Sequence, residues 1–170
     1  MDKNKFHTKL FQKYLPFVLS GLLICAVLLS TSTLIVKYKL GIVDLLFINT
    51  CIVGEIIAIF ALLLKNKPLA GLSIPLLLWF GIGGRLNFSG SWFSPMHLTH
   101  VLMVLVSIYL LYLVWKVIAG KKKAFWVSFA IGVILLFFLL FMMGWYYSTH
   151  PEAYKILLDV GWQGQEFRWK

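Results

Sequence analysis

Five long apolar segments make up most of the chain, and they restrict its fold more than any other feature of the sequence. They cover residues 14–36, 40–64, 68–84, 95–118 and 124–147. A helix of about 20 apolar residues matches the thickness of the hydrocarbon core of a bilayer. The pattern therefore predicts an all-α integral membrane protein, a bundle of about five transmembrane helices with a short amphipathic helix at the C-terminus. Because the connecting turns are short, helices that follow each other are expected to be antiparallel neighbours.

The composition supports a membrane protein and argues against a nucleic-acid partner. Of the 170 residues, 61% are hydrophobic and 13% are charged, whereas a soluble domain has about 45–50% and about 25%. The net charge of +10 comes largely from lysines in short clusters at the ends of the apolar segments. Such clusters are topology signals that face anionic lipid headgroups. Cys25 and Cys51 both lie within apolar segments, so we interpret them as small buried hydrophobic residues.

The distribution of lysine and arginine predicts an orientation in the membrane. With the N-terminus inside, ten of these residues fall on the inner side and six on the outer side, which is the bias of cytoplasmic loops. The expected regions are a basic cytoplasmic N-terminus over residues 1–13, a five-helix transmembrane domain over 14–148 and an extracytoplasmic amphipathic tail over 149–170. The plasma membrane is the expected location. In the tail, Tyr154, Leu157 and Leu158 are expected to share one face of a helix over residues 150–160.

One polar and aromatic stretch, GIGGRLNFSGSWFSPMHLTH at residues 81–100, interrupts the middle of the chain. The side chains that this stretch and the end of the fifth segment place at one outer level are Arg85, Trp92, His97, His100 and His150. A guanidinium group can hold a phosphate or carboxylate with two hydrogen bonds, and an indole can stack on a flat ligand. The sequence therefore predicts a patch for a ligand or partner at the outer membrane boundary.

Two other interpretations of this patch stay open. Basic and aromatic residues also anchor helices at the membrane interface without any further function. The three histidines, His97, His100 and His150, are weak candidates for metal or haem ligands, because imidazole is a common ligand but their spacing matches no metal-binding motif.

The second apolar segment carries two acidic residues, Asp44 and Glu55. In a continuous helix, positions 44, 48, 51 and 55 would form one stripe, so both carboxyl groups would face the same way. A charged carboxylate deep in the membrane costs at least about 2–3 kcal/mol if it faces lipid, so Glu55 is expected to face the bundle. It is expected to be protonated or paired, with a hydroxyl, an amide, water or an ion as its partner. It is either a proton or cation site, or a neutral group that fixes helix packing.

The sequence favours a protein without catalytic activity. It contains no hydrolase elbow, zinc-protease motif, phosphate-binding loop or paired-cysteine redox motif. The first functional hypothesis is an accessory or ligand- and partner-binding component that acts through its outer face. The alternatives are a proton- or cation-coupled transporter subunit using Asp44 and Glu55, and a redox subunit that binds haem or a quinone through the outer histidines. In each case the expected partners are the lipid bilayer and other membrane subunits or further copies of the chain.

Overall fold

The computed structural model describes residues 3–87, 95–120 and 122–163, and every regular element in these ranges is an α-helix. The helices are α1 (Lys3–Tyr38), α2 (Ile42–Ile48), α3 (Cys51–Leu63), α4 (Lys67–Asn87), α5 (Pro95–Ala119), α6 (Lys123–Thr149) and α7 (Pro151–Asp159). By length and composition, α1, α4, α5 and α6 can each cross a membrane, and α2 with α3 makes a fifth span if the bent pair counts as one. The described part of the chain is thus the all-helical bundle that the sequence predicts.

The second span is broken, so the prediction of one helix over residues 40–64 is wrong. The axes of α2 and α3 meet at 82°, and Asn49 has φ −114° and ψ 46°, outside the helical region. Its side-chain amide donates to the hydroxyl oxygens of Ser30 (3.3 Å) and Thr31 (3.4 Å) on α1. A polar side chain that offers such bonds competes with the regular helix, and here it ties the bend to the neighbouring helix.

Two hydroxyl groups satisfy the carbonyl oxygens that the bend removes from the helical ladder. The Thr50 hydroxyl lies 3.0 Å from the carbonyl oxygen of Leu46 and 2.8 Å from that of Phe47. The Tyr147 hydroxyl, from α6, donates to the same Phe47 carbonyl oxygen at 2.8 Å. Buried carbonyl groups at a helix end need such partners, so the sequence around residues 49–50 stabilises the bend rather than merely tolerating it.

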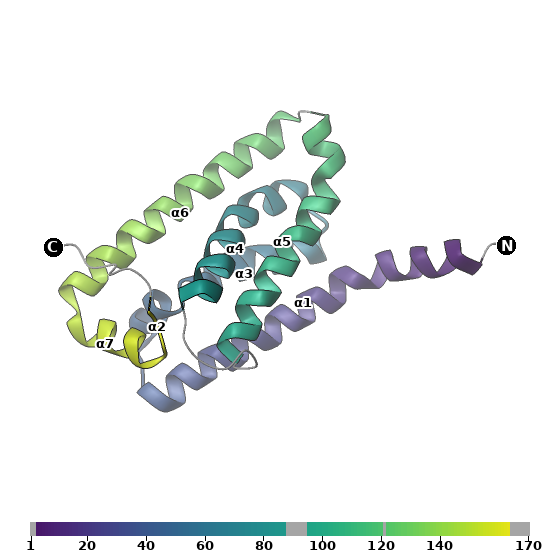
Figure 1. Ribbon diagram of the computed structural model, residues 1–170. Helices are drawn as coiled ribbons and strands as arrows, with labels where there is room; N and C mark the ends of the chain where they lie inside the picture. Colours follow the sequence, from purple (N-terminus) through teal and green to yellow (C-terminus); the bar gives the residue numbers. More distant parts are fainter. Residues whose placement is uncertain (1–2, 88–94, 121, 164–170) are drawn as a thin grey trace.

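Helix α4 lies at the centre of the bundle (Figure 1), and α3, α5 and α6 all pack on it. Its side chains Ile74, Leu76 and Leu77 are fully buried, and the helix runs through Pro75 without interruption. Although α6 follows α5 in the chain, it packs mainly on α4. The expectation that successive helices are close neighbours therefore holds for α3, α4 and α5 but not for α6.

Glycines set how closely the neighbours approach α4. A Cβ atom on Gly132 of α6 would lie 2.4 Å from the carbonyl oxygen of Leu72, and one on Gly84 would lie 2.0 Å from the His100 ring. Small residues allow such close approach between membrane helices. The third apolar segment was expected to end at residue 84, but the helix continues to Asn87 because Gly84 serves helix packing rather than a helix end.

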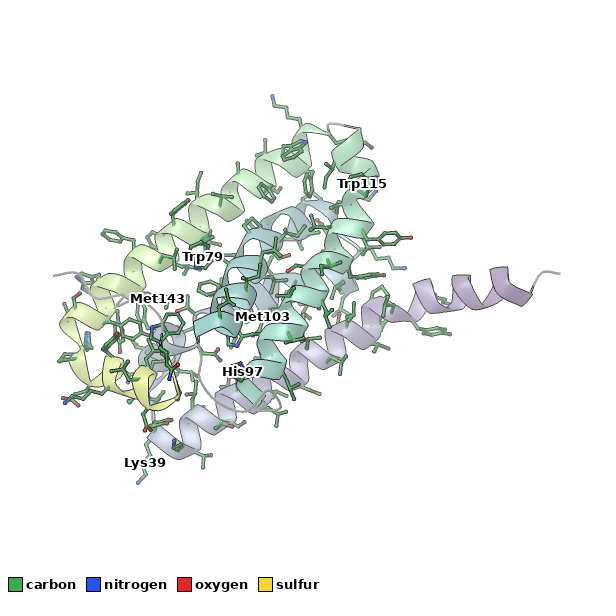
Figure 2. All side chains as sticks on the ribbon, viewed as in Figure 1. Lys39, Trp79, His97, Met103, Trp115 and Met143 are labelled. Carbon is green, nitrogen blue, oxygen red and sulfur yellow. The ribbon has the colours of Figure 1, made fainter. Side chains whose placement is uncertain are left out.

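The outward surface of the bundle is apolar. Ile134, Phe137, Phe138 and Phe141 of α6 are all more than half exposed, and Figure 2 shows side chains projecting along the whole outer side of α6. A helix that is hydrophobic on every side belongs in a membrane or a large core. Figure 2 also shows Trp115 at the opposite end of α5 from His97.

The first helix begins earlier than the sequence predicts, whereas the short helix near the C-terminus agrees with its predicted limits. Helix α1 begins at Lys3, so the basic segment up to residue 13 continues the first span as helix. Helix α7 confirms the short amphipathic helix in the tail, with Tyr154 and Leu157 buried. Leu158 was expected on the buried face but is 47% exposed. Figure 1 shows α7 and α2 at the same end of the bundle, opposite the turn between α5 and α6.

Candidate pocket at the bend of the second span

A pocket of about 60 Å³ lies where α2 and α3 meet the ends of the other helices. Its polar lining consists of Asn49, Thr50, Cys51 and His100, its aromatic lining of Trp79, Phe80 and Trp162, and the rest of Leu34, Ile48, Gly83, Gly84, Met143 and Leu157. These residues come from all seven helices, from the bend between α2 and α3, and from the residues after α7. The bend supplies most of the polar groups, because it leaves polar side chains where an unbroken apolar helix would present none.

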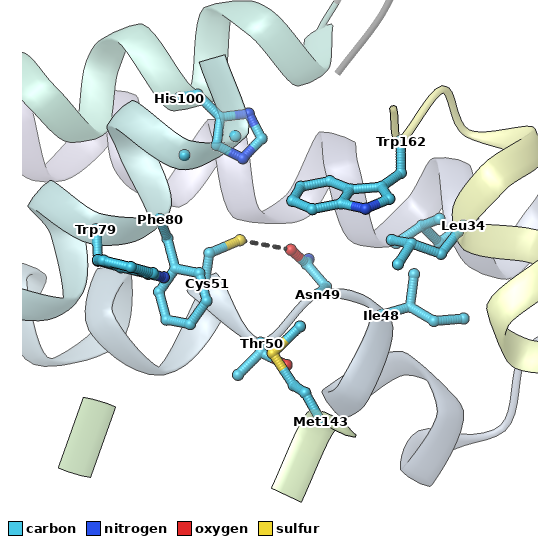
Figure 3. Close-up of a pocket in the computed structure, with 13 residues that line it drawn as sticks. Leu34, Ile48, Asn49, Thr50, Cys51, Trp79, Phe80, His100, Met143 and Trp162 are labelled. Carbon is cyan, nitrogen blue, oxygen red and sulfur yellow. Dashed lines mark hydrogen bonds between the residues drawn. The ribbon is translucent and has the colours of Figure 1, made fainter. Parts of the chain in front are cut away.

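The polar side chains of the pocket are held in place by their own hydrogen bonds (Figure 3). The Cys51 thiol donates to the side-chain oxygen of Asn49 at 2.9 Å, while the Asn49 amide nitrogen is bonded to α1. On the facing side, the His100 ring packs against the backbone of Gly84. The polar groups are therefore fixed before any ligand enters, which lowers the entropic cost of binding.

A second, apolar cavity adjoins this pocket. It is a groove of about 390 Å³ lined by Pro75, Leu78, Trp79, Ile82, Gly83 and Leu136. Trp79 and Gly83 line both cavities. Because Trp79 is 52% exposed and Ile82 is 48% exposed, the groove opens sideways on the apolar surface of the bundle, between α4 and α6.

The structure brings together only part of the predicted outer patch. His97 and His100 are both buried in the first turns of α5, and only His100 lines the pocket. His150 is exposed and stacks on Tyr146, with ring centroids 4.3 Å apart. Arg85 lies on α4, but its side chain is outside the described part of the structure, as is the whole of Trp92. The role of Arg85 and Trp92 in the patch stays a prediction.

The bend separates the two acidic residues that were expected to share a stripe. Asp44, on α2, accepts a hydrogen bond from the Tyr146 hydroxyl of α6. The Tyr146 ring also stacks on Phe47, with centroids 4.0 Å apart. Asp44 thus fastens α2 to α6. The prediction that it faces the same way as Glu55 is wrong, because the two residues lie on helices inclined at 82°.

Glu55 is fully buried on α3, as expected for an acid that avoids lipid. Neither of its carboxyl oxygens has a hydrogen-bond partner among the described residues. The polar groups nearest in sequence are engaged elsewhere, because Asn49 bonds to Ser30 and Thr31, and Thr50 bonds to carbonyls of α2.

Sequence reasoning missed most of the pocket. Of its lining, the sequence analysis singled out only His100 as a candidate for ligand binding. Two adjacent polar residues in an apolar segment were the signal of a bend. Trp79, Phe80 and Met143 carry no such signal, because apolar residues in a membrane helix are expected everywhere.

The described residues do not form a metal centre of the predicted kind. They contain no group of three histidine, cysteine, aspartate or glutamate side chains placed to hold an ion. His150 stacks on Tyr146 and is not among the residues that line the pocket with His100. The metal and haem interpretation of the three histidines therefore gains no support from the fold.

The tail that covers one side of the pocket is fastened to the end of α1. The Tyr38 hydroxyl donates to the Asp159 carboxylate at 2.5 Å, and the Lys37 ammonium group lies 3.3 Å from the same oxygen. These hydrogen bonds, first that of Tyr38 and then that of Lys37, hold the pKa of the Asp159 carboxyl below its usual value. Leu157 and Trp162, on either side of Asp159, line the pocket.

This contact predicts a pH dependence at the tail. Since the pKa of Asp159 is lower in the folded state, the contact stabilises the docked tail above the unfolded value of about 3.9. That contribution is lost as the pH falls through the folded value. We expect Tyr38→Phe to raise the pKa of Asp159, as measured by a carbon NMR titration of the side-chain carboxyl. Glu152, which pairs with Lys155 instead, is the internal control, and an unchanged Asp159 titration would show that the contact does not form in solution.

Comparison with known proteins finds no matching family model, no similar curated protein and no similar solved structure. The functional argument therefore depends on the geometry of the pocket and of the buried acid.

Proposed function

We propose that this chain is a non-catalytic component of a cell membrane that binds an amphipathic molecule at the bend of its second span. The main supporting observation is that a small pocket, which carries a few polar side chains in an otherwise apolar lining, shares Trp79 and Gly83 with a larger apolar groove. A polar end group would bind among Asn49, Cys51 and His100, and an apolar chain would follow the groove between α4 and α6. A ligand of this shape reaches the groove from the lipid without crossing water.

The volume of the small pocket limits the size of the ligand group that can enter it. A volume of about 60 Å³ accommodates a few water molecules or one small polar group, whereas sites for drug-sized ligands are about 300–1,000 Å³. A haem or a quinone ring is too large for this pocket alone. A lipid-like molecule with a small head group, whose bulk stays in the groove, fits both volumes.

Filling the pocket should abolish binding without disturbing the fold. A Cβ atom at Gly83 meets no atom within 4 Å, so Gly83→Phe adds a ring at a residue that lines both cavities. A Cβ atom at Gly21, an exposed residue of α1, also meets no atom within 4 Å, so Gly21→Phe is the control. We expect native mass spectrometry of protein extracted with its surrounding lipid to show an amphipathic molecule on the wild type and on Gly21→Phe, and none on Gly83→Phe.

Either of two results would contradict this proposal. The first is a wild-type protein that retains no molecule beyond loosely bound bulk lipid. The second is retention of the same molecule, at the same occupancy, by Gly83→Phe.

The proposed orientation places the N-terminus in the cytoplasm and the pocket end outside the plasma membrane. It is supported by the excess of lysine on the inner side. The apolar outer faces of α1 and α6 would contact lipid, other membrane subunits or further copies of the chain.

The orientation and the crossing of the second span are tested by labelling single cysteines, in a background in which Cys25 and Cys51 are replaced by alanine. With five crossings, an impermeant thiol reagent applied to intact cells should modify Lys155→Cys but neither Lys3→Cys nor Lys122→Cys. The reverse pattern would contradict the orientation. Labelling of Lys3→Cys and Lys155→Cys from the same side would show that α2 and α3 re-enter the membrane surface rather than crossing.

A further inference from the structure

Glu55 differs from every other acidic residue that the structure describes. Asp44 bonds to Tyr146, Glu152 to Lys155, and Asp159 to Tyr38 and Lys37. Each of those three acids is at least partly accessible to solvent. Glu55 alone is 0% exposed, and both of its oxygens are without a partner in the described chain.

The surroundings of Glu55 favour its neutral form. Burial of an ionised carboxylate without hydrogen bonds is so unfavourable that the group takes up a proton instead. No charged or titratable side chain of α1, α4 or α5, the helices packed on α3, acts on Glu55 in the described part of the bundle. Among the residues that the structure describes, the titratable group that interacts with Glu55 is the Cys51 thiol, on α3 itself, and a thiol supplies no positive charge.

The same helix connects Glu55 to the pocket. Cys51 lines the pocket and precedes Glu55 by four residues, so the two side chains lie on one face of α3, about one helical turn apart. The pocket has space for a few water molecules and polar groups to hold them. Four residues at about 1.5 Å each span about 6 Å, so a proton would have to move only about this far along the helix between pocket water and the carboxyl group.

From this arrangement we propose that Glu55 is a proton-binding site within the bundle, neutral at rest, which exchanges its proton with water in the pocket. The exchange breaks the carboxyl O–H bond and transfers the proton to a pocket water, leaving a carboxylate, and the reverse step restores the acid. The charge of such a site changes when a proton binds or leaves. A proton-coupled membrane protein needs a group of this kind within the membrane. It does not require the amphipathic ligand, so either proposal can fail alone.

Infrared spectroscopy of the protein in lipid nanodiscs at pH 7 tests this directly. Exposed aspartate and glutamate ionise near pH 4 (about 3.9 and 4.3), so they contribute no protonated carboxyl band at pH 7. We expect one such band in the wild type. It should be absent from Glu55→Gln, present in Asp44→Asn and Glu152→Gln, and shifted soon after transfer to heavy water.

Each part of the proposal has an outcome that would overturn it. A wild type without the band has an ionised Glu55, and a band that persists in Glu55→Gln belongs to another group. A band that does not shift in heavy water belongs to a proton that does not exchange. The pocket route predicts that Gly83→Phe slows the shift at least tenfold while Gly21→Phe does not, and an equal rate in both variants would exclude that route. If Glu55→Gln does not fold, carbon-13 labelling of glutamate in a Glu152→Gln, Glu166→Gln double variant, in which Glu55 is the one remaining glutamate, identifies the band instead.

Discussion

Gly132→Ala is expected to lower the stability of the bundle by about 2 kcal/mol, although alanine is the better helix former. The added Cβ atom would lie 2.4 Å from the carbonyl oxygen of Leu72 and 3.1 Å from its carbonyl carbon. These are backbone atoms of the central helix, so no side chain can rotate away and α6 must move outward. Overpacking costs about 1–3 kcal/mol or more, and we expect the upper value, about 3 kcal/mol, against backbone atoms. The gain of about 1 kcal/mol from replacing glycine in a helix then leaves a net loss of about 2 kcal/mol. Thermal unfolding in mild detergent measures the difference.

Gly21→Ala is the control for this substitution. A Cβ atom at Gly21 meets nothing within 4 Å, so only the helix propensity changes and the stability should stay the same or rise slightly. If Gly132→Ala is as stable as Gly21→Ala, the close contact between Gly132 of α6 and Leu72 of α4 does not form.

Most of the helical architecture follows from the sequence, because the length and hydropathy of a segment are properties of that segment. The limits of the apolar segments at residues 95–118 and 124–147 lie within three residues of the ends of α5 and α6. The neighbours of a helix depend instead on long-range packing. The position of α6 on α4 depends on close contact between Gly132 and the backbone of Leu72. The sequence around Gly132 does not indicate that Leu72 is its contact partner.

The bend marks the limit of inference from helical periodicity. Asp44 and Glu55 share a stripe only if the helix between them is continuous. Asn49 and Thr50 have hydrogen-bond partners on α1 and α2 that compensate the loss of helical bonds. Whether such partners exist is decided by the tertiary structure. The periodic pattern alone therefore predicted, wrongly, that the Asp44 side chain faces the same way as Glu55.

The same dependence explains why the candidate site was only partly predictable. Histidines stand out in an apolar sequence, so His100 was identified before the fold was known. The aromatic and aliphatic walls do not stand out, and the pocket they form requires the tail to fold back. The folded-back position of the tail depends on contacts between α7 and α1, such as the hydrogen bond from Tyr38 to Asp159. These two residues are 121 positions apart in the chain.

The bend, the pocket and the buried acid belong to one structural unit. The bend places polar groups at the pocket, and α3, which starts at the bend, carries Glu55 into the interior one turn later. The clamp between Asp44 and Tyr146 holds the other arm of the bend against α6. A change at the clamp should therefore alter both the pocket and the access of protons to Glu55.

Glu55→Lys is expected to prevent folding. The free energy of unfolding of Glu55→Gln should instead lie within about 1 kcal/mol of the wild-type value, because the two side chains have similar volumes. Lysine adds length at a site with no exposed surface and carries a charge, which costs at least about 2.5–3.5 kcal/mol at the centre of a membrane helix. Overpacking adds about 1–3 kcal/mol, so the sum, about 3.5–6.5 kcal/mol, reaches the lower end of the stability of a typical domain, about 5–15 kcal/mol. Glutamine keeps the size of the protonated acid and introduces no charge.

The measurements are the yield of monodisperse protein and thermal unfolding in mild detergent, with Ile56→Lys as the matched control. Ile56 is the next residue on α3 and is 45% exposed, so a lysine there can extend along the surface toward the headgroups. We expect Ile56→Lys to be less damaging than Glu55→Lys by at least about 2 kcal/mol, because it avoids the overpacking and part of the charge penalty. If Glu55→Lys folds with unchanged thermal stability, position 55 faces lipid or water, and neither a proton site nor a packing role for Glu55 can be maintained.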